Sequence, residues 1–181
     1  NGLPASPLGN LGWYLGRIVI HPEDDRDIFM LGVRLWRTRD NGTTWTMATS
    51  GSSGIHVDNH DLVFGPDGTI YLNDQYNNRI RKISTDGIVT TFAGKGERAQ
   101  DVDPVDGVPA TKTSLNTFWA RLALGSDGSL YIGDGEPDRR GGMYLSVESV
   151  ADEYQNAQVE QESGFVADEQ LVPFFSFRRS W

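Results

Sequence analysis

The residues best suited to chemistry gather in segment 56–61, which contains two histidines and two aspartates. In an extended strand, alternate side chains project from one face about 6.5 to 7 Å apart, so His56, Asp58 and His60 would share a face. Imidazole nitrogens and a carboxylate are good ligands for zinc and other first-row divalent metals. These three residues are therefore candidates for zinc binding or catalysis. The alternative is a polar stretch whose histidines bond to the backbone.

Two acidic segments are candidates for calcium binding through their carboxylate oxygens. One contains Asp134, Glu136 and Asp138, and the other is the aspartate-rich stretch 101–107. Neither segment has the ligand spacing of a twelve-residue EF-hand loop, so solvated turns are the alternative. Asp58 and Asp134, with His60, are also candidate catalytic residues for sugar hydrolysis, although the sequence does not determine the separation of the two carboxylates.

The composition excludes several classes of function. A net charge of -9 over 181 residues argues against nucleic-acid binding, because phosphate contacts need clustered Lys and Arg. The chain has no cysteine, so disulfides and thiolate chemistry are excluded. No apolar run reaches the roughly 18 residues that would predict a membrane span. The remaining partners are proteins, glycans and cations.

The elements that would position these residues follow from an internal repeat. Segment 62–74 (LVFGPDGTIYLND) recurs as 122–134 (LALGSDGSLYIGD). Each copy predicts two strands joined by a tight turn, at Asp67-Gly68 or at Asp127-Gly128. After the first copy, alternating residues, an Asp-Gly turn and a β-branched run over 77–93 predict two more strands. Four consecutive strands are the content of one propeller blade.

The region from Leu62 to Asp134 resembles the NHL-repeat β-propeller family. The likeness includes 77–80 (NNRI) and 86–96 (DGIVTTFAGKG), and the second copy departs from the pattern after Asp134. In that family the residue before the innermost strand lies near the central channel, where some related amidating lyases bind zinc through histidine. The resemblance implies a ligand-facing place for His60, and for Trp119 and Arg121 before the second copy.

Upstream, segment 38–45 (TRDNGTTW) resembles the Asp-box of BNR and sortilin-like propellers. Thr38, Asp40, Gly42, Thr44 and Trp45 match the pattern, with threonine in place of the usual serine. The resemblance implies a structural role, in which Asp and Thr cap a hairpin turn and Trp packs between strands.

The predicted fold is all-β, a β-propeller or partial propeller of four-stranded antiparallel blades. Residues 1–146 would hold an Asp-box unit at about 13–50 and NHL-like units at about 56–96 and 117–146. The remainder, 147–181, predicts a short helix from Glu148 to Ala157 and an aromatic closing strand or docking segment. A ring of six blades needs on the order of 250 residues, so we expect a fragment, an incomplete solenoid or an oligomer that completes the ring.

The function predicted from the sequence is a non-catalytic propeller module that recognises protein or glycan, at an extracellular or cell-surface location. Its candidate ligand-binding residues are His56, Asp58, His60, Trp119 and Arg121. The alternative is a propeller enzyme acting on carbohydrate, a glycoside hydrolase or lyase, with the His56, Asp58 and His60 site. No cofactor is certain, and zinc and calcium are the two candidates.

Overall fold

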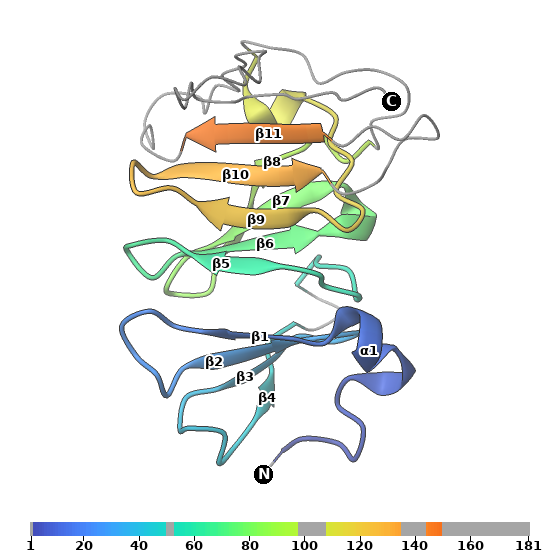
Figure 1. Cartoon of the computed structure of the whole chain (residues 1–181), viewed down its shortest axis with the longest axis vertical. Helices are drawn as coiled ribbons and strands as arrows, with labels where there is room; N and C mark the ends of the chain where they lie inside the picture. Colours follow the sequence, from blue (N-terminus) through green and yellow to red (C-terminus); the bar gives the residue numbers. More distant parts are fainter. Residues whose placement is uncertain (1, 50–52, 98–107, 135–143, 150–181) are drawn as a thin grey trace, which may run out of the picture.

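The computed structural model describes residues 2–49, 53–97, 108–134 and 144–149, and these residues form an all-β protein. Three antiparallel sheets follow one another along the chain and stack face to face (Figure 1). Within each sheet the strands lie in the order in which they occur in the sequence. This is the arrangement of blades in a β-propeller, and the three sheets are called blades 1, 2 and 3 below.

Blade 1 contains β1 (Arg17–Ile20), β2 (Ile28–Leu31), β3 (Trp36–Thr38) and β4 (Thr46–Met47), preceded by η1 (Gly9–Leu11) and α1 (Gly12–Leu15). Blade 2 contains β5 (Leu62–Phe64), β6 (Ile70–Asp74), β7 (Arg79–Ile83) and β8 (Val89–Ala93), with η2 (Gln75–Asn77) between β6 and β7. Blade 3 contains β9 (Arg121–Leu124), β10 (Ser129–Asp134) and β11 (Tyr144–Ser149), and it follows η3 (Ala110–Lys112). Its β9 and β11 both pair with β10.

The two predicted Asp-Gly hairpins form, and they have the same hydrogen bonds. The Asp67 carboxylate accepts from the backbone N–H of Thr69 at 2.9 Å and from its hydroxyl at 2.7 Å. Asp127 makes the equivalent bonds to Ser129 at 3.0 and 2.9 Å. The following glycines have φ of 81° and 88°, a left-handed conformation that glycine adopts without strain. The sequence repeat is therefore a repeat of local structure.

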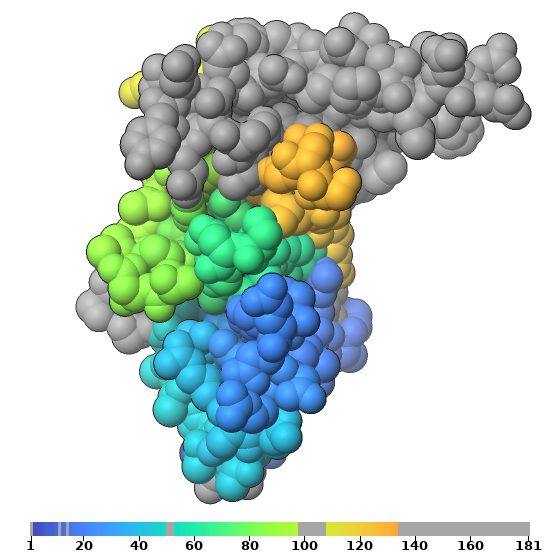
Figure 2. Space-filling model, turned by 90° about the vertical axis from the view of Figure 1, so that its left-hand side faces the viewer, coloured from blue at the N-terminus to red at the C-terminus, as the bar shows by residue number. Residues whose placement is uncertain are grey.

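Two apolar layers hold the blades together. Between blades 1 and 2 lie Phe29, Leu31, Leu35, Ile55, Leu62, Ile70 and Leu72, and between blades 2 and 3 lie Tyr71, Ile80, Ala93, Ala110, Leu115, Ala120, Leu122, Leu130 and Ile132. Every residue of β6 is buried, because both faces of blade 2 are covered. Figure 2 shows blade 1, in blue, directly against blade 2, in green.

The helix predicted from Glu148 to Ala157 is wrong over its first two residues. Val147 to Ser149 belong to β11, and Val147 pairs with Tyr131 of β10. Leu145 and Val147 alternate with polar residues, and the edge of β10 offers backbone bonds that outweigh a weak helical propensity. The rest of the predicted helix and the aromatic end, 150–181, lie outside the described residues. In the described part of the chain, no helix is long and apolar enough to cross a membrane.

Candidate functional site

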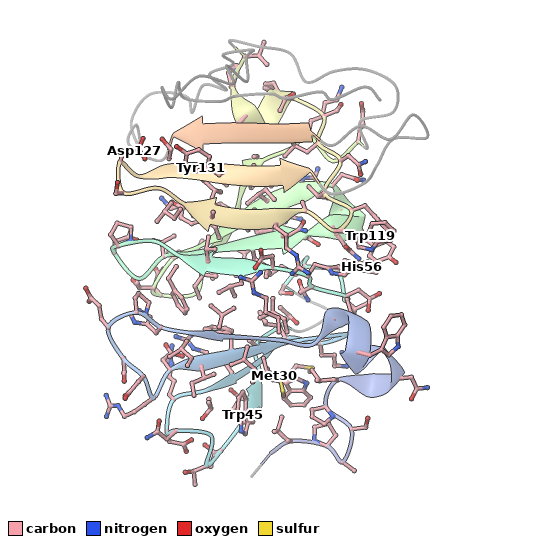
Figure 3. The ribbon with its side chains drawn as sticks, viewed as in Figure 1. Met30, Trp45, His56, Trp119, Asp127 and Tyr131 are labelled. Atoms are coloured by element: carbon pink, nitrogen blue, oxygen red, sulfur yellow. The ribbon has the colours of Figure 1, made fainter. Side chains whose placement is uncertain are left out.

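The two ends of the blades differ in character. Because the strands are antiparallel, the hairpins after the first and third strand of each blade lie at one end, which includes Asp127 (Figure 3). The connections between blades, and the link from β6 to β7, lie at the other end, where His56 and Trp119 are found (Figure 3). The predicted ligand-binding residues thus belong to the end opposite the Asp-Gly turns.

Four aromatic rings form a continuous row at this end, called here the aromatic platform: His56, Tyr76, Phe118 and Trp119. Successive ring centroids are 4.7 Å apart for His56 and Tyr76, 5.4 Å for Tyr76 and Phe118, and 5.2 Å for Phe118 and Trp119. These separations are typical of favourable aromatic pairs. Tyr76 is 47% exposed and Trp119 is 38% exposed, so large rings of blades 2 and 3 face solvent together.

Buried amides fix the platform to the end of β6. The Gln75 side-chain oxygen accepts from the backbone N–H of Trp119 at 3.3 Å, and the Gln75 carbonyl accepts from the hydroxyl of Thr117 at 2.9 Å. The side-chain amide of Asn73 donates to the carbonyls of Thr117 and Ala120 at 2.9 and 3.0 Å. The loop before β9 is therefore held to blade 2 at several points, and its rings cannot move independently of that blade.

Trp119 has a left-handed backbone conformation, with φ of 62°. This conformation costs a non-glycine residue on the order of 1 kcal/mol or more, and a bulky residue adopts it only when its surroundings require it. Glycine would fit the same backbone without strain. Tryptophan therefore carries, at this partly exposed position, a backbone strain that glycine would not carry.

The predicted histidine and aspartate triad is not assembled as the sequence analysis expected. Segment 56–61 is not extended, since Asp58 has φ of 66° and β5 begins only at Leu62. His56 is exposed and belongs to the platform, whereas His60 is 3% exposed and lies inside the blade. Among residues 2–49, 53–97, 108–134 and 144–149, no group of three His, Asp or Glu side chains is placed to hold a metal ion. The premise of a shared strand face is wrong, because a left-handed residue interrupts the alternation.

His60 and its neighbour Asp61 are buried among blade contacts. Burial lowers the pKa of His60 to about 4, and the positive charge of Arg121 acts in the same direction. Arg121 donates to the His60 carbonyl at 3.0 Å. His60 is therefore neutral at physiological pH. Arg121, a candidate ligand-binding residue at the start of β9, is an exposed cation.

Asp61 links all three blades, a role that the sequence analysis missed. Its carboxylate accepts from the backbone N–H of Leu62 at 2.7 Å and of Leu122, in blade 3, at 2.8 Å. It also forms an ion pair with Arg17 of blade 1. Burial raises the pKa of Asp61, and the bonds from Leu122 and the charge of Arg17 oppose that rise. The acid that precedes the inner strand of blade 2 is structural.

Residues of segment 38–45 close the hairpin between β3 and β4. The Asp40 carboxylate accepts from the backbone N–H and hydroxyl of Thr44 at 2.8 and 2.6 Å, and from the Thr38 hydroxyl at 2.7 Å. These bonds lower the pKa of Asp40 to about 2. The Trp45 indole N–H donates to the Gly42 carbonyl at 3.0 Å. All of these groups serve the turn itself.

The candidate calcium residues cannot be placed. The side chain of Asp134, and Glu136 and Asp138 entirely, lie outside the described residues, so the calcium site and the Asp58 and Asp134 pair stay predictions. The corresponding acid of blade 2, Asp74, is engaged by Arg81 at 2.8 Å and by the amide of Asn77 at 2.8 and 3.0 Å. In blade 2 the last residue of the repeat is a structural carboxylate.

A groove of about 780 Å³ lies between blades 1 and 2 and is a separate candidate site. Its floor is apolar, with Leu35, Ile55 and Ile70, and Arg37 and Arg39 are among its lining residues. Arg37 is paired with Asp27 at 2.7 and 2.5 Å. Among its described lining residues, Phe29 is the one Phe, Tyr or Trp, and it is buried. The groove therefore lacks the exposed aromatic rings of the platform.

Sequence reasoning identified His56 and Trp119 but missed Tyr76 and Phe118. Both are aromatic residues that directly adjoin a predicted strand end, Tyr76 after the first repeat copy and Phe118 before the second. The sequence did carry a signal for them: each is an aromatic residue in a polar connection, and both connections lie at the same end of the blades. Their mutual contact depends on how blades 2 and 3 pack.

No family model matches the chain, and no curated protein matches it in sequence. Among solved structures, the chain is similar to a protein of unknown function from Bacteroides thetaiotaomicron, with 23% identity and a TM-score of 0.52. That similarity covers 84% of this chain and 38% of the other. A virginiamycin B lyase from Staphylococcus aureus is 14% identical, with a TM-score of 0.43 over 75% of this chain and 41% of the lyase. A putative gluconolactonase is 14% identical, with a TM-score of 0.39 over 89% of this chain and 50% of its own.

The first likeness concerns the fold alone. This chain spans well under two thirds of the length of each of these structures.

Proposed function

We propose that this chain is a non-catalytic propeller module that binds a glycan on the aromatic platform. The observation that carries the proposal is Trp119, a partly exposed indole held in a strained left-handed conformation beside Tyr76 and Phe118. Backbone strain at a partly exposed aromatic residue supports a role in function.

The chemistry of the platform suits a sugar ligand. The apolar C–H face of a sugar ring packs on an aromatic ring, and the sugar hydroxyls bond to nearby polar groups. His56 and Arg121 are polar residues at this end of the blades, and both are exposed. A protein ligand would use the same rings and is the second outcome that a binding experiment must distinguish.

The enzyme alternative has less support. It requires a base and an acid that converge on one substrate atom, and geometry comes first in such an assignment. His56, exposed on the platform, and His60, buried in the blade, do not face one space. We also propose that blades 2 and 3 are NHL-type repeats and that blade 1 is an Asp-box repeat. The proposed location of the protein is extracellular or on the cell surface.

The test is a glycan array followed by calorimetry with the sugars that bind. Trp119→Gly removes the indole and suits the left-handed backbone, so we expect affinity to fall at least about tenfold while the melting temperature stays close to wild type. Tyr76→Ala should also weaken binding. Ile88→Ala is the matched control, because Ile88 is exposed in the turn at the opposite end of blade 2 and should not change affinity.

Two results would overturn the proposal. One is unchanged sugar affinity in Trp119→Gly, which would place the ligand elsewhere on the molecule. The other is the absence of binding to any glycan combined with capture of a protein ligand that depends on Trp119, which would assign the platform to protein recognition.

A further inference from the structure

A row of apolar side chains crosses the face of blade 2 that is turned toward blade 1. Phe64 pairs with Ile70, Ile70 with Ile83, and Ile83 with Val89, so these four residues lie side by side on the four strands. The inner part of the row is covered, because Phe64 contacts Phe29 of blade 1, with ring centroids 5.9 Å apart, and Ile70 is 5% exposed. Ile83 and Val89, on the two outer strands, are only partly buried.

Opposite these outer strands, the face of blade 1 changes from apolar to polar. Phe29 pairs with Arg37, and Arg37 pairs with Thr46 of β4. The outer strand β4 has two residues, whereas the outer strand β8 of blade 2 has five. The space between the outer strands is the groove of about 780 Å³, and its floor continues the buried apolar layer between the two blades.

The groove is locally cationic, although the chain carries a net charge of -9. Its described lining residues include two arginines and no Asp or Glu. Arg37 is neutralised by Asp27, and its guanidinium lies 4.8 Å from the centroid of the Phe29 ring. Arg39 is exposed, and among the described residues no hydrogen bond or ion pair engages its guanidinium. One positive charge beside the apolar floor is therefore available to a ligand.

The acids of a second hollow give such a ligand its direction. This hollow adjoins the groove at the turns of the hairpin end, and Glu23, Asp24 and Asp86 are among the residues that line it. Arg37 and Arg39 line both the hollow and the groove. An anionic group would therefore be held at the boundary between the two, and repulsion by the acids would direct the rest of the ligand into the groove.

We propose that the groove binds a small linear carboxylate, with the carboxylate on Arg39 and the apolar chain on Ile83 and Val89. A guanidinium binds a carboxylate through charge-assisted N–H···O bonds, and an apolar chain gains free energy by leaving water. The volume lies within the roughly 300 to 1,000 Å³ of small-molecule sites.

The groove is a property of an internal junction, because blades 1 and 2 pack directly on each other (Figure 1). It is lined by different residues from those of the aromatic platform. The inference therefore goes beyond the glycan-binding function and does not depend on it.

The first test is a chemical-shift titration of the full chain with octanoate, octanol and acetate. Octanoate carries both groups that the groove should recognise, whereas octanol lacks the charge and acetate lacks the chain. We expect octanoate to bind at least about tenfold more tightly than either, with the largest shift changes at residues that line the groove. Equal affinity for octanoate and octanol, or the absence of saturable shift changes at the groove, would overturn the proposal.

Arg39→Gln separates recognition of the charge from contact with the apolar floor. It should lower the affinity for octanoate about tenfold and leave the affinity for octanol unchanged, because it removes only the cation. Arg34→Gln is the matched control, since Arg34 is an exposed arginine of the same blade that is not among the residues lining the groove. It should leave both affinities unchanged. Wild-type affinity for octanoate in Arg39→Gln would contradict the assignment of the carboxylate.

Ala48→Trp tests the apolar part of the site. Ala48 is exposed and lines the groove, so a larger side chain there should occupy the space of the ligand chain and weaken the binding of octanoate and octanol alike. Circular dichroism should show that the fold is retained, and undiminished binding would place the ligand chain elsewhere. Trp119→Gly should bind octanoate as the wild type does, so a failure of this proposal is distinguishable from a failure of the glycan proposal.

Discussion

The two ends of the blades differ in the residues that adopt a left-handed backbone conformation. At the hairpin end, glycine fills the left-handed positions of the two repeat turns, at Gly68 and Gly128, and the preceding aspartates bond to the turn; Asn41 fills such a position in the turn between β3 and β4. At the platform end, Asp58 and Trp119 adopt the left-handed conformation without being glycine. Glycine adopts this conformation in the repeat turns without strain, whereas Asp58 and Trp119 at the platform end carry the strain of a non-glycine residue in it.

The acids of the two ends also differ. Hydrogen bonds from Ser or Thr and from the backbone lower the pKa of Asp40 and of Asp127. At Asp67 burial acts to raise the pKa, but the same kinds of hydrogen bonds outweigh it, so the pKa is lowered there too. Burial raises the pKa of Asp61 at the platform end. Much of the acidic character of this chain therefore serves turns, and it is poor evidence for a ligand-binding site.

Asp61→Ala should have the largest effect of any substitution that distinguishes the two ends. It leaves the buried N–H groups of Leu62 and Leu122 without their acceptor and removes the partner of Arg17. We expect a loss of about 3 kcal/mol in the free energy of unfolding, measured with urea. Asp127→Ala, in an exposed turn, is the comparison and should cost much less. Equal losses would show that Asp61 does not link the blades.

His60 should make the protein less stable as the pH decreases from 6.5 to about 4, whereas the raised pKa of Asp61 acts in the opposite direction as that carboxyl gains a proton. His60 has a pKa of about 4 in the folded protein, below its ordinary value of 6.5, so in this window the unfolded chain binds a proton that the folded protein does not. The loss can reach about 3 kcal/mol if His60 stays neutral throughout.

His60→Gln should reduce the change in melting temperature between pH 6.5 and about 4. The turn acid Asp40 provides the contrast, since its lowered pKa contributes stability above pH 3.8 that is lost as the pH falls toward about 2. Asp40→Asn should therefore change the profile only below pH 4. A profile between pH 6.5 and 4 that His60→Gln does not alter would contradict the assignment.

The smallest effects come from exchanging glycine and side chain at left-handed positions. Gly87 has φ of 88°, and open space surrounds the place that an added methyl group would occupy, so Gly87→Ala adds strain alone and should cost about 1 kcal/mol. Trp119→Gly should change stability by less than about 0.5 kcal/mol, because relief of strain offsets lost ring contact and added chain entropy. Thermal unfolding measures both. A larger loss for Trp119→Gly than for Gly87→Ala would make the indole a packing residue.

Local sequence rules predicted the elements of this protein well. The Asp-Gly turns, the four strands of blade 2 and the hairpin around Asp40 depend on neighbouring residues, whose backbone preferences act over a few positions. The extended reading of 56–61 failed because one left-handed residue, Asp58, breaks the alternation, and an aspartate gives little warning of that conformation. The helix predicted from Glu148 was wrong at Glu148 and Ser149, because the edge of β10 was available for pairing.

By itself, the sequence determined that the chain is all-β, that its strands come in blade-sized groups, and that several of its aspartates close turns. Only the tertiary structure decided that Tyr76 and Phe118 join His56 and Trp119, that Asp61 connects three blades, and that Ile18 and Ile20 are exposed while Leu62 and Leu122 are not. The reason is that turns and strand alternation depend on neighbouring residues. The platform and the apolar layers between the blades are formed by residues far apart in the chain, and they exist only once one blade packs on another.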